Sequence, residues 1–117
     1  MEIERKFLVP RLPEGYDTHP FHQIEQAYLC TGPVVRIRQE DEDYYLTYKG
    51  KGLLSREEYN LPLTREAYSH LLPKADGIVL TKKRYLIPLD SPGHLTIELD
   101  VFEGRYAGLI LAEVEFP

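Results

Sequence analysis

The stretch MEIERKFLV (residues 1–9) places its charged and apolar side chains in alternation from the second residue onward. Every second position carries a charge: Glu2, Glu4 and Lys6. Successive side chains of a strand point to opposite faces, so this alternation predicts a β-strand. The ordinary explanation is a half-buried strand whose charges face water. The alternative is that these charges line an interior that itself holds charge, and the rest of the chain has to decide between the two.

The composition predicts one small globular domain over residues 1–117. Hydrophobic residues make up 43% of the chain and charged residues 28%, which is typical of a soluble protein. No apolar stretch approaches the roughly 20 residues that span a bilayer, and no signal-peptide pattern follows Met1. A single cysteine, Cys30, fits a reducing compartment, so we expect a cytoplasmic protein without a membrane partner. The net charge of −5 provides no overall positive field for nucleic acid, and we expect no nucleic-acid partner.

The alternating segments predict eight strands separated by turn signals. They lie at Glu2–Val9, Ile24–Leu29, Val34–Glu40, Tyr44–Lys49, Ser55–Leu61, Gly77–Leu89, Leu95–Glu103 and Leu109–Phe116. One helix is expected over Leu63–Leu72, with Thr64 as its cap and Pro73 as its end. This pattern predicts an α+β fold, mainly antiparallel β, in which eight strands form a closed or nearly closed barrel with one or few helices.

The charges of the predicted strands form sets of one sign. VRIR places Arg36 and Arg38 on one strand face, and IELD does the same for Glu98 and Asp100. Like charges on adjacent positions of one face repel, which a solvated surface has no reason to repeat. Guanidinium and ammonium groups suit phosphoryl oxygens, whereas close carboxylates suit hard cations such as Mg²⁺. A face carrying both kinds of set therefore favours a metal-chelated polyphosphate as ligand.

These motifs resemble a known family. EIERK at residues 2–6 matches the E-x-E-x-K signature of the CYTH, or triphosphate tunnel metalloenzyme, superfamily. The resemblance continues in order through YL (28–29), VRIR (35–38), LTYKGKG (46–52), SREEYN (55–60), TKKRY (81–85), IELDVFEG (97–104) and GLILAEVEF (108–116). It covers nearly the whole chain and implies a closed antiparallel barrel whose charged tunnel binds a small-molecule triphosphate with a divalent metal, Mg²⁺ or Mn²⁺.

The resemblance also implies roles for individual residues. The expected phosphate-binding residues are Lys6, Arg36, Arg38, Lys49, Lys82 and Arg84, with Lys83 as an alternative to Lys82. The expected metal ligands are Glu2, Glu4, Glu115 and Glu113, and Glu58, Asp100 and Glu98 are expected to position a second metal or the attacking water. Of these residues, Glu58, Lys6 and Arg84 are expected to be catalytic, with Glu58 accepting the proton of the water.

The implied activity is hydrolysis of inorganic tripolyphosphate through in-line attack by water on a terminal phosphoryl group. The alternatives within the fold are adenylate cyclase and thiamine triphosphatase, and the alternative outside enzymes is a polyphosphate- or nucleotide-binding module. Two departures from the family pattern are expected to matter: Asn60 stands where relatives often carry an acid, and the sequence ends at Pro117, where family members commonly continue into a helical segment. The oligomeric state stays open, with a homodimer as one option.

Overall fold

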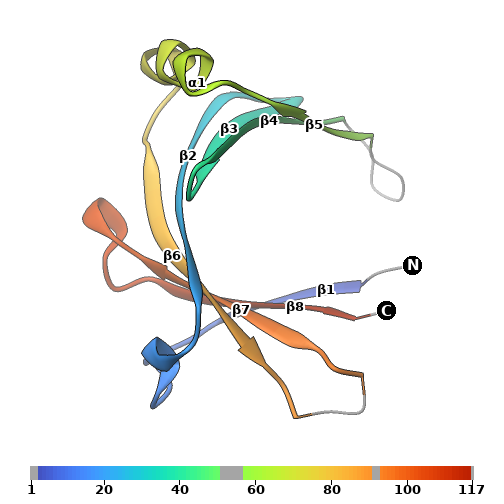
Figure 1. Cartoon of the computed structure of the whole chain (residues 1–117), viewed down its shortest axis with the longest axis vertical. Coiled ribbons are helices and arrows are strands. Elements are labelled where there is room, and N and C mark those ends of the chain that lie inside the picture. The colour runs from blue at the N-terminus through green and yellow to red at the C-terminus, as the bar shows by residue number, and fades with distance from the viewer. Residues whose placement is uncertain (1–2, 51–56, 91–92, 117) are drawn as a thin grey trace. The chain divides into compact units, whose positions relative to one another are not determined.

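The computed structural model describes residues 3–50, 57–90 and 93–116. Its eight strands and one α-helix confirm the predicted elements (Figure 1). The strands are β1 (Ile3–Leu8), β2 (Phe21–Thr31), β3 (Val34–Glu40), β4 (Asp43–Lys49), β5 (Glu58–Pro62), β6 (Leu80–Pro88), β7 (Thr96–Phe102) and β8 (Ile110–Phe116), and the helix is α1 (Arg65–Leu71). Three short 3₁₀ turns lie at Tyr16–Thr18, Leu72–Lys74 and Gly104–Tyr106.

The strands form an eight-stranded sheet in the order β1-β8-β7-β6-β2-β3-β4-β5. The pairs β1–β8, β8–β7, β7–β6, β2–β3, β3–β4 and β4–β5 are antiparallel, which confirms the predicted class. Closure of this sheet into a barrel stays a prediction. By its internal contacts the chain divides into two compact units, the first comprising residues 1–23 with 82–117 and the second residues 24–81.

In the first unit, apolar side chains cover one face of the sheet. Tyr85, Leu99 and Ile110, one from each of β6, β7 and β8, form a buried cluster against which Tyr16 and Val9 pack. The ring of Tyr16 meets that of Tyr85 edge to face at 5.0 Å between centroids. Because side chains alternate along each strand, the residues between these apolar positions are directed to the opposite face. That opposite face carries the charges.

In the second unit, α1 packs on the sheet strands β3 and β4. Tyr68 of the helix lies in a buried cluster with Ala27 of β2 and Ile37 of β3. The predicted cap is confirmed, since the side-chain oxygen of Thr64 accepts a hydrogen bond of 3.0 Å from the backbone N–H of Ala67. The predicted end is only approximate. The α-helix ends at Leu71, and Pro73 lies within the 3₁₀ turn Leu72–Lys74 that follows it.

Three strands differ from the expectation in position or exposure. Strand β6 begins at Leu80 rather than at Gly77, and β5 begins at Glu58, while the predicted positions Ser55 and Arg56 lie outside the described residues. Strand β2 begins at Phe21 rather than at Ile24, and the backbone N–H of Leu86 in β6 donates to the carbonyl of Pro20 just before it. Strand β5 is exposed along all five residues, with Tyr59 and Leu61 each 55% accessible.

The helices of the described residues are too short and too polar to cross a membrane.

Candidate active site

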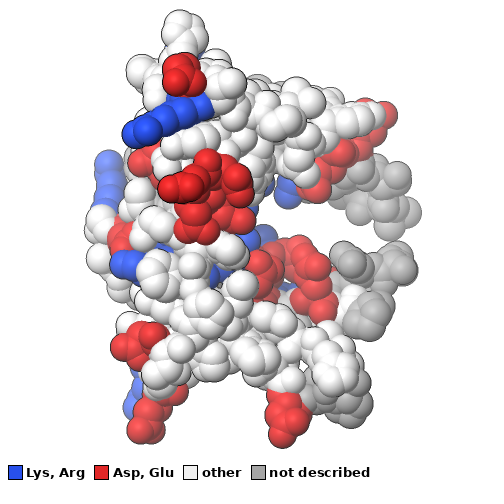
Figure 2. Space-filling view, viewed as in Figure 1, with Lys and Arg blue, Asp and Glu red and all other residues white. Residues whose placement is uncertain are grey.

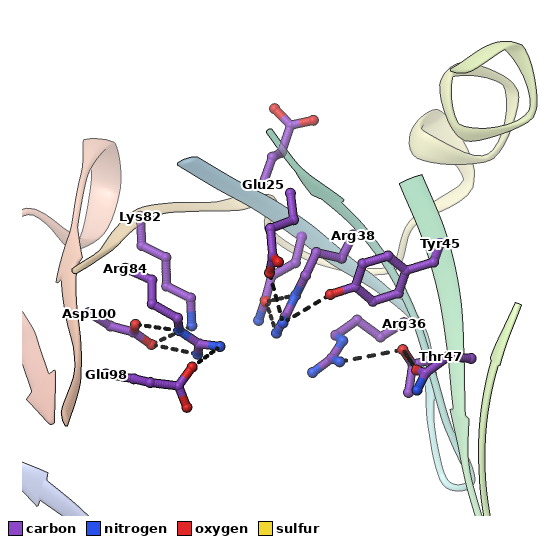
Figure 3. A network of polar contacts seen from close by, with 12 residues as sticks. Glu25, Arg36, Arg38, Tyr45, Thr47, Lys82, Arg84, Glu98 and Asp100 are labelled. Carbon is purple, nitrogen blue, oxygen red and sulfur yellow. Dashed lines mark hydrogen bonds and ion pairs between the residues drawn. The ribbon is translucent and has the colours of Figure 1, made fainter. Parts of the chain in front are cut away.

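The charged face of the first unit holds a buried group of ions. Asp100 of β7 accepts hydrogen bonds from Lys82 Nζ at 2.7 Å, from Arg84 Nε at 2.8 Å and from Arg84 Nη2 at 3.0 Å (Figure 3). The register explains the meeting, because Arg84 of β6 lies directly opposite Asp100. Lys82 and Asp100 are only 6% and 4% accessible. The explanation of these charges as a solvated exterior is therefore wrong for this group.

The same ions hold Asp100 in its ionised form. Burial alone would raise the pKa of this carboxyl, but the hydrogen bonds from Arg84 and the charge of Lys82 outweigh burial and lower it below its ordinary value. Arg84 also approaches Glu98 at 3.3 Å and Glu113 at 3.8 Å. Each cation of this group thus has a carboxylate partner.

The choice between two neighbouring lysines follows from the alternation of β6. Lys82 lies on the face of Asp100, and its Nζ also stands 5.2 Å from the ring centre of Phe102. Lys83 binds Glu103 at 2.9 Å, with both side chains about one third accessible. Lys82, and not Lys83, belongs to the charged group.

A carboxylate pair lies where β1 meets β8. Burial and a hydrogen bond with Glu4 raise the pKa of Glu113 to about 7. Two carboxyl groups that interact in this way can instead bind one divalent cation, since such cations take carboxylate oxygens as ligands. Lys6 lies directly opposite Glu113, yet its side chain is 68% accessible and stands 3.6 Å from Glu4.

The positions of the other predicted metal ligands are given by the strand register. Glu115 lies opposite Glu4 in the β1–β8 register, and Glu98 lies opposite Glu113. Within the described residues, no three Asp, Glu, His or Cys side chains are gathered closely enough to hold a metal ion. Glu2 lies outside the described residues. The metal assignments therefore stay predictions, and the raised pKa of Glu113 beside Glu4 supports that pair among them.

A pocket of about 320 Å³ opens beside two of these carboxylates. Its lining residues are Leu86, His94, Leu95, Thr96, Glu98 and Glu115. His94 has a backbone φ of 51°, a left-handed conformation that is uncommon outside glycine. The pocket lies at the hairpin end of β7 and gives Glu98 and Glu115 access to solvent.

The second unit carries a pair of arginines on β3. Arg38 is 8% accessible and donates from Nε and Nη2 to the side-chain oxygen of Gln26, at 3.0 and 2.7 Å, and from Nη1 to the Tyr45 hydroxyl at 3.3 Å (Figure 3). Glu40 stands 3.9 Å from Nη1, beyond hydrogen-bond distance. The close partners of Arg38 are therefore uncharged groups.

Arg36 is held still more loosely. Its Nη2 lies 3.5 Å from the Thr47 hydroxyl, which in turn donates to Asn60 at 2.6 Å. Its Nε is buried and has no hydrogen-bond partner among the described residues. Burial and repulsion by Arg38 lower the pKa of Arg36 and outweigh the hydrogen bond with Tyr28, which raises it, so the charge of Arg36 is incompletely compensated. A partly buried guanidinium in this condition has unused N–H donors that an anion can satisfy.

The last predicted pair lies at the end of β4. Lys49 is directly opposite Glu58 of β5, and Lys49 Nζ lies 3.4 Å from the carboxylate. Half of the Glu58 side chain is accessible. This exposure leaves Glu58 solvated, and its role as a proton acceptor stays a prediction.

The structure also contains contacts that the sequence analysis missed. Gln26, Tyr45 and Thr47 contact the two arginines. These three side chains are uncharged, so the pattern of charges in the sequence did not indicate them. In the space-filling view, acidic and basic side chains form small groups among uncharged ones, so the visible, described part of that face carries no broad basic patch (Figure 2).

Comparison with known proteins agrees with the motifs. The model of the CYTH domain family matches residues 1–117. An inorganic triphosphatase of Nitrosomonas europaea is 40% identical over 118 residues, covering 98% of this chain and 76% of the relative. An inorganic triphosphatase of Acetivibrio thermocellus is 31% identical, covering 99% of this chain and 74% of the relative.

Solved structures give the same result for the fold. The crystal structure of an inorganic triphosphatase superposes with a TM-score of 0.74 at 35% identity, covering 99% of this chain and 73% of the other. A crystal structure of a putative adenylate cyclase from Bacillus halodurans gives a TM-score of 0.69 at 18% identity, covering 99% of this chain and 80% of the other. The latter likeness shows the fold alone.

Proposed function

The chain belongs to the CYTH domain family, and from this premise we propose that it is an inorganic triphosphatase that hydrolyses tripolyphosphate with the help of a divalent metal ion. The observation that carries the proposal is the arginine pair of β3, in which Arg38 is buried and Arg36 is partly buried. Arg36 and Arg38 bring two positive charges onto one strand face without a carboxylate at hydrogen-bond distance. Such a pair is incomplete until an anion binds, and phosphoryl oxygens match guanidinium groups in charge and geometry.

The metal ion in this proposal is Mg²⁺ or Mn²⁺. The raised pKa of Glu113 beside Glu4 supports it, because a divalent cation can compensate the two carboxylates in place of a proton. Glu4, Glu113 and Glu115 would hold the ion, together with Glu2. When bound, such an ion draws charge from phosphoryl oxygens and lowers the pKa of water.

In the proposed reaction, water attacks a terminal phosphoryl group in line with the leaving diphosphate. Phosphoryl transfer depends mainly on positioning and on neutralising charge, so it requires no nucleophilic side chain. Arg36 and Arg38 bind phosphoryl oxygens and stabilise the charge that develops on them. Lys6, Lys49, Lys82 and Arg84 add positive charge, and Glu58 accepts the proton of the water.

The charged group of the first unit has a distinct part in this scheme. Asp100 and Glu98 were expected to position a second metal or the water, and we propose that Asp100 first of all fixes Lys82 and Arg84, since its oxygens already accept three hydrogen bonds. Glu98 has fewer contacts and borders the open pocket, so it is the better candidate for contact with the water. The proposal also includes closure of the eight strands into one barrel domain, as the family implies.

The test is phosphate release from tripolyphosphate by the purified chain. We expect release with Mg²⁺ or Mn²⁺ and none after chelation, and we expect the Arg36→Met variant to lose at least 90% of the rate at a fixed low substrate concentration. The Arg65→Met variant is the matched control, because Arg65 is an exposed residue at the start of α1.

Two other results would change the conclusion. Tight tripolyphosphate binding without release would make the chain a binding module rather than an enzyme. Cyclic AMP formed from ATP at a rate above that of phosphate release from tripolyphosphate would instead favour the adenylate cyclase alternative.

A further inference from the structure

The buried cations of the two units differ in the kind of partner that holds them. In the first unit, Lys82 and Arg84 donate to the carboxylate of Asp100. In the second unit, Arg38 donates to the amide of Gln26 and the hydroxyl of Tyr45. Both arrangements orient the cation, but a carboxylate partner also cancels its charge, whereas an amide leaves the charge intact.

Gln26 is placed to hold the guanidinium of Arg38 in one orientation. The residue is 5% accessible and lies directly opposite Arg38 in the β2–β3 register. Its single carbonyl oxygen accepts from two nitrogens of the guanidinium, Nε at 3.0 Å and Nη2 at 2.7 Å. These bonds fix the plane of the group along one edge. Of its five N–H donors, the bonds to Gln26 and Tyr45 use three, and two stay available to a ligand.

Arg36, on the same strand as Arg38, also has uncharged partners. Arg36 approaches the Thr47 hydroxyl, and Thr47 donates to the amide oxygen of Asn60, so this chain of contacts also ends on a neutral group. The nearest carboxylate to Arg38 is that of Glu40 at 3.9 Å, which is partly solvated at 29% side-chain accessibility. Neutral partners thus recur at both arginines.

We infer that Gln26 is a positioning residue for the substrate: it holds Arg38 in a fixed orientation through an uncharged acceptor, so that the full positive charge of the guanidinium stays available to a phosphoryl group. This inference rests on the proposed function and deepens it. A glutamate at the same position would hold Arg38 equally well but would satisfy its charge before the substrate arrives. Neutrality, and not only hydrogen bonding, is then the property that position 26 supplies.

Two near-isosteric variants separate these properties. Gln26→Glu keeps the acceptor and adds a negative charge, while Gln26→Leu keeps the approximate volume and removes the acceptor. We expect Gln26→Glu to raise the Kd for tripolyphosphate, measured by calorimetry in the absence of metal, at least 10-fold without lowering the melting temperature. We expect Gln26→Leu to lower the melting temperature, because it leaves the buried guanidinium without its main acceptor.

The dissociation between affinity and stability is the decisive readout. If Gln26 merely supported the fold, affinity would follow stability, so Gln26→Glu would bind as the unchanged protein does and Gln26→Leu would bind worse. Equal affinity of the Gln26→Glu variant, or a loss of affinity that only parallels a lower melting temperature, overturns the inference. A KM raised with kcat nearly unchanged in the phosphate-release assay supports it.

The failure of this inference is distinguishable from failure of the proposed function. Unchanged protein that hydrolyses tripolyphosphate, together with a Gln26→Glu variant of equal Kd, overturns the inference alone. Unchanged protein that binds but does not hydrolyse tripolyphosphate overturns the proposed activity alone, and the Kd comparison still decides the role of Gln26. Absence of any binding by the unchanged protein overturns both.

Discussion

Replacing Asp100 with asparagine removes the shared partner of two buried cations while keeping the size of the side chain. Breaking a buried ion pair from one side costs about 3–5 kcal/mol of unfolding free energy, because a buried charge is left without compensation. Arg84 retains Glu98 at 3.3 Å and Glu113 at 3.8 Å, so the loss falls mainly on Lys82. We therefore expect the lower end of the range, about 3 kcal/mol. For a domain of 117 residues this corresponds to a melting temperature lower by about 12 °C.

The measurement is urea unfolding at pH 7, followed by circular dichroism and by the fluorescence of the nine tyrosines, since the chain has no tryptophan. Glu103→Gln is the matched control. Glu103 binds Lys83, the neighbour of Lys82 in β6, at 2.9 Å, but both side chains are about one third accessible, and accessible ion pairs contribute little to stability. The double variant Lys82→Met with Asp100→Asn should recover much of the loss. An Asp100→Asn variant no less stable than Glu103→Gln would refute the reasoning.

Three further results are expected. Arg36→Met should leave the melting temperature equal or higher and raise the KM for tripolyphosphate at least 10-fold, because it removes a partly buried, incompletely compensated charge; a lower melting temperature would contradict this account of Arg36. Thr64→Ala should lower the unfolding free energy by about 1 kcal/mol in urea, with Thr64→Ser close to the unchanged protein, because the cap of α1 depends on the hydroxyl. Burial and the hydrogen bond to Glu25 raise the pKa of Tyr68 above its ordinary value of 10.0, so its contribution to stability is complete below pH 10 and is lost as the pH rises beyond it; the urea midpoint should fall above pH 10 less steeply in Tyr68→Phe, and equal slopes would speak against the assignment.

The sequence predicted the elements of the fold well because they rest on local patterns. A strand is indicated by the alternation within VRIR, and another by that within IELD. The start of the helix is indicated by the capping residue Thr64. The errors lie where distant segments meet. The early start of β2 accompanies a hydrogen bond between Leu86 and Pro20, 66 positions apart by their numbers, and no local pattern reports it.

The candidate site was predictable in its charges but not in their partners. The period of two placed Arg36 with Arg38 and Glu98 with Asp100 on common faces. Which cation meets a carboxylate depends on strand register: Arg84 lies opposite Asp100, whereas Arg36 lies opposite Thr47. Register is set by pairing between segments, so the difference between compensated and uncompensated cations appeared only in the structure. Gln26 was missed for the same reason.

The accessible strand β5 bears on how the protein behaves when concentrated. Two of its five exposed residues, Tyr59 and Leu61, are large and apolar, so they can associate with the same residues of a second copy. The charge of Glu58 on the same strand opposes this association. Because salt screens the charge and not the apolar side chains, samples kept at high ionic strength should have the shorter storage life.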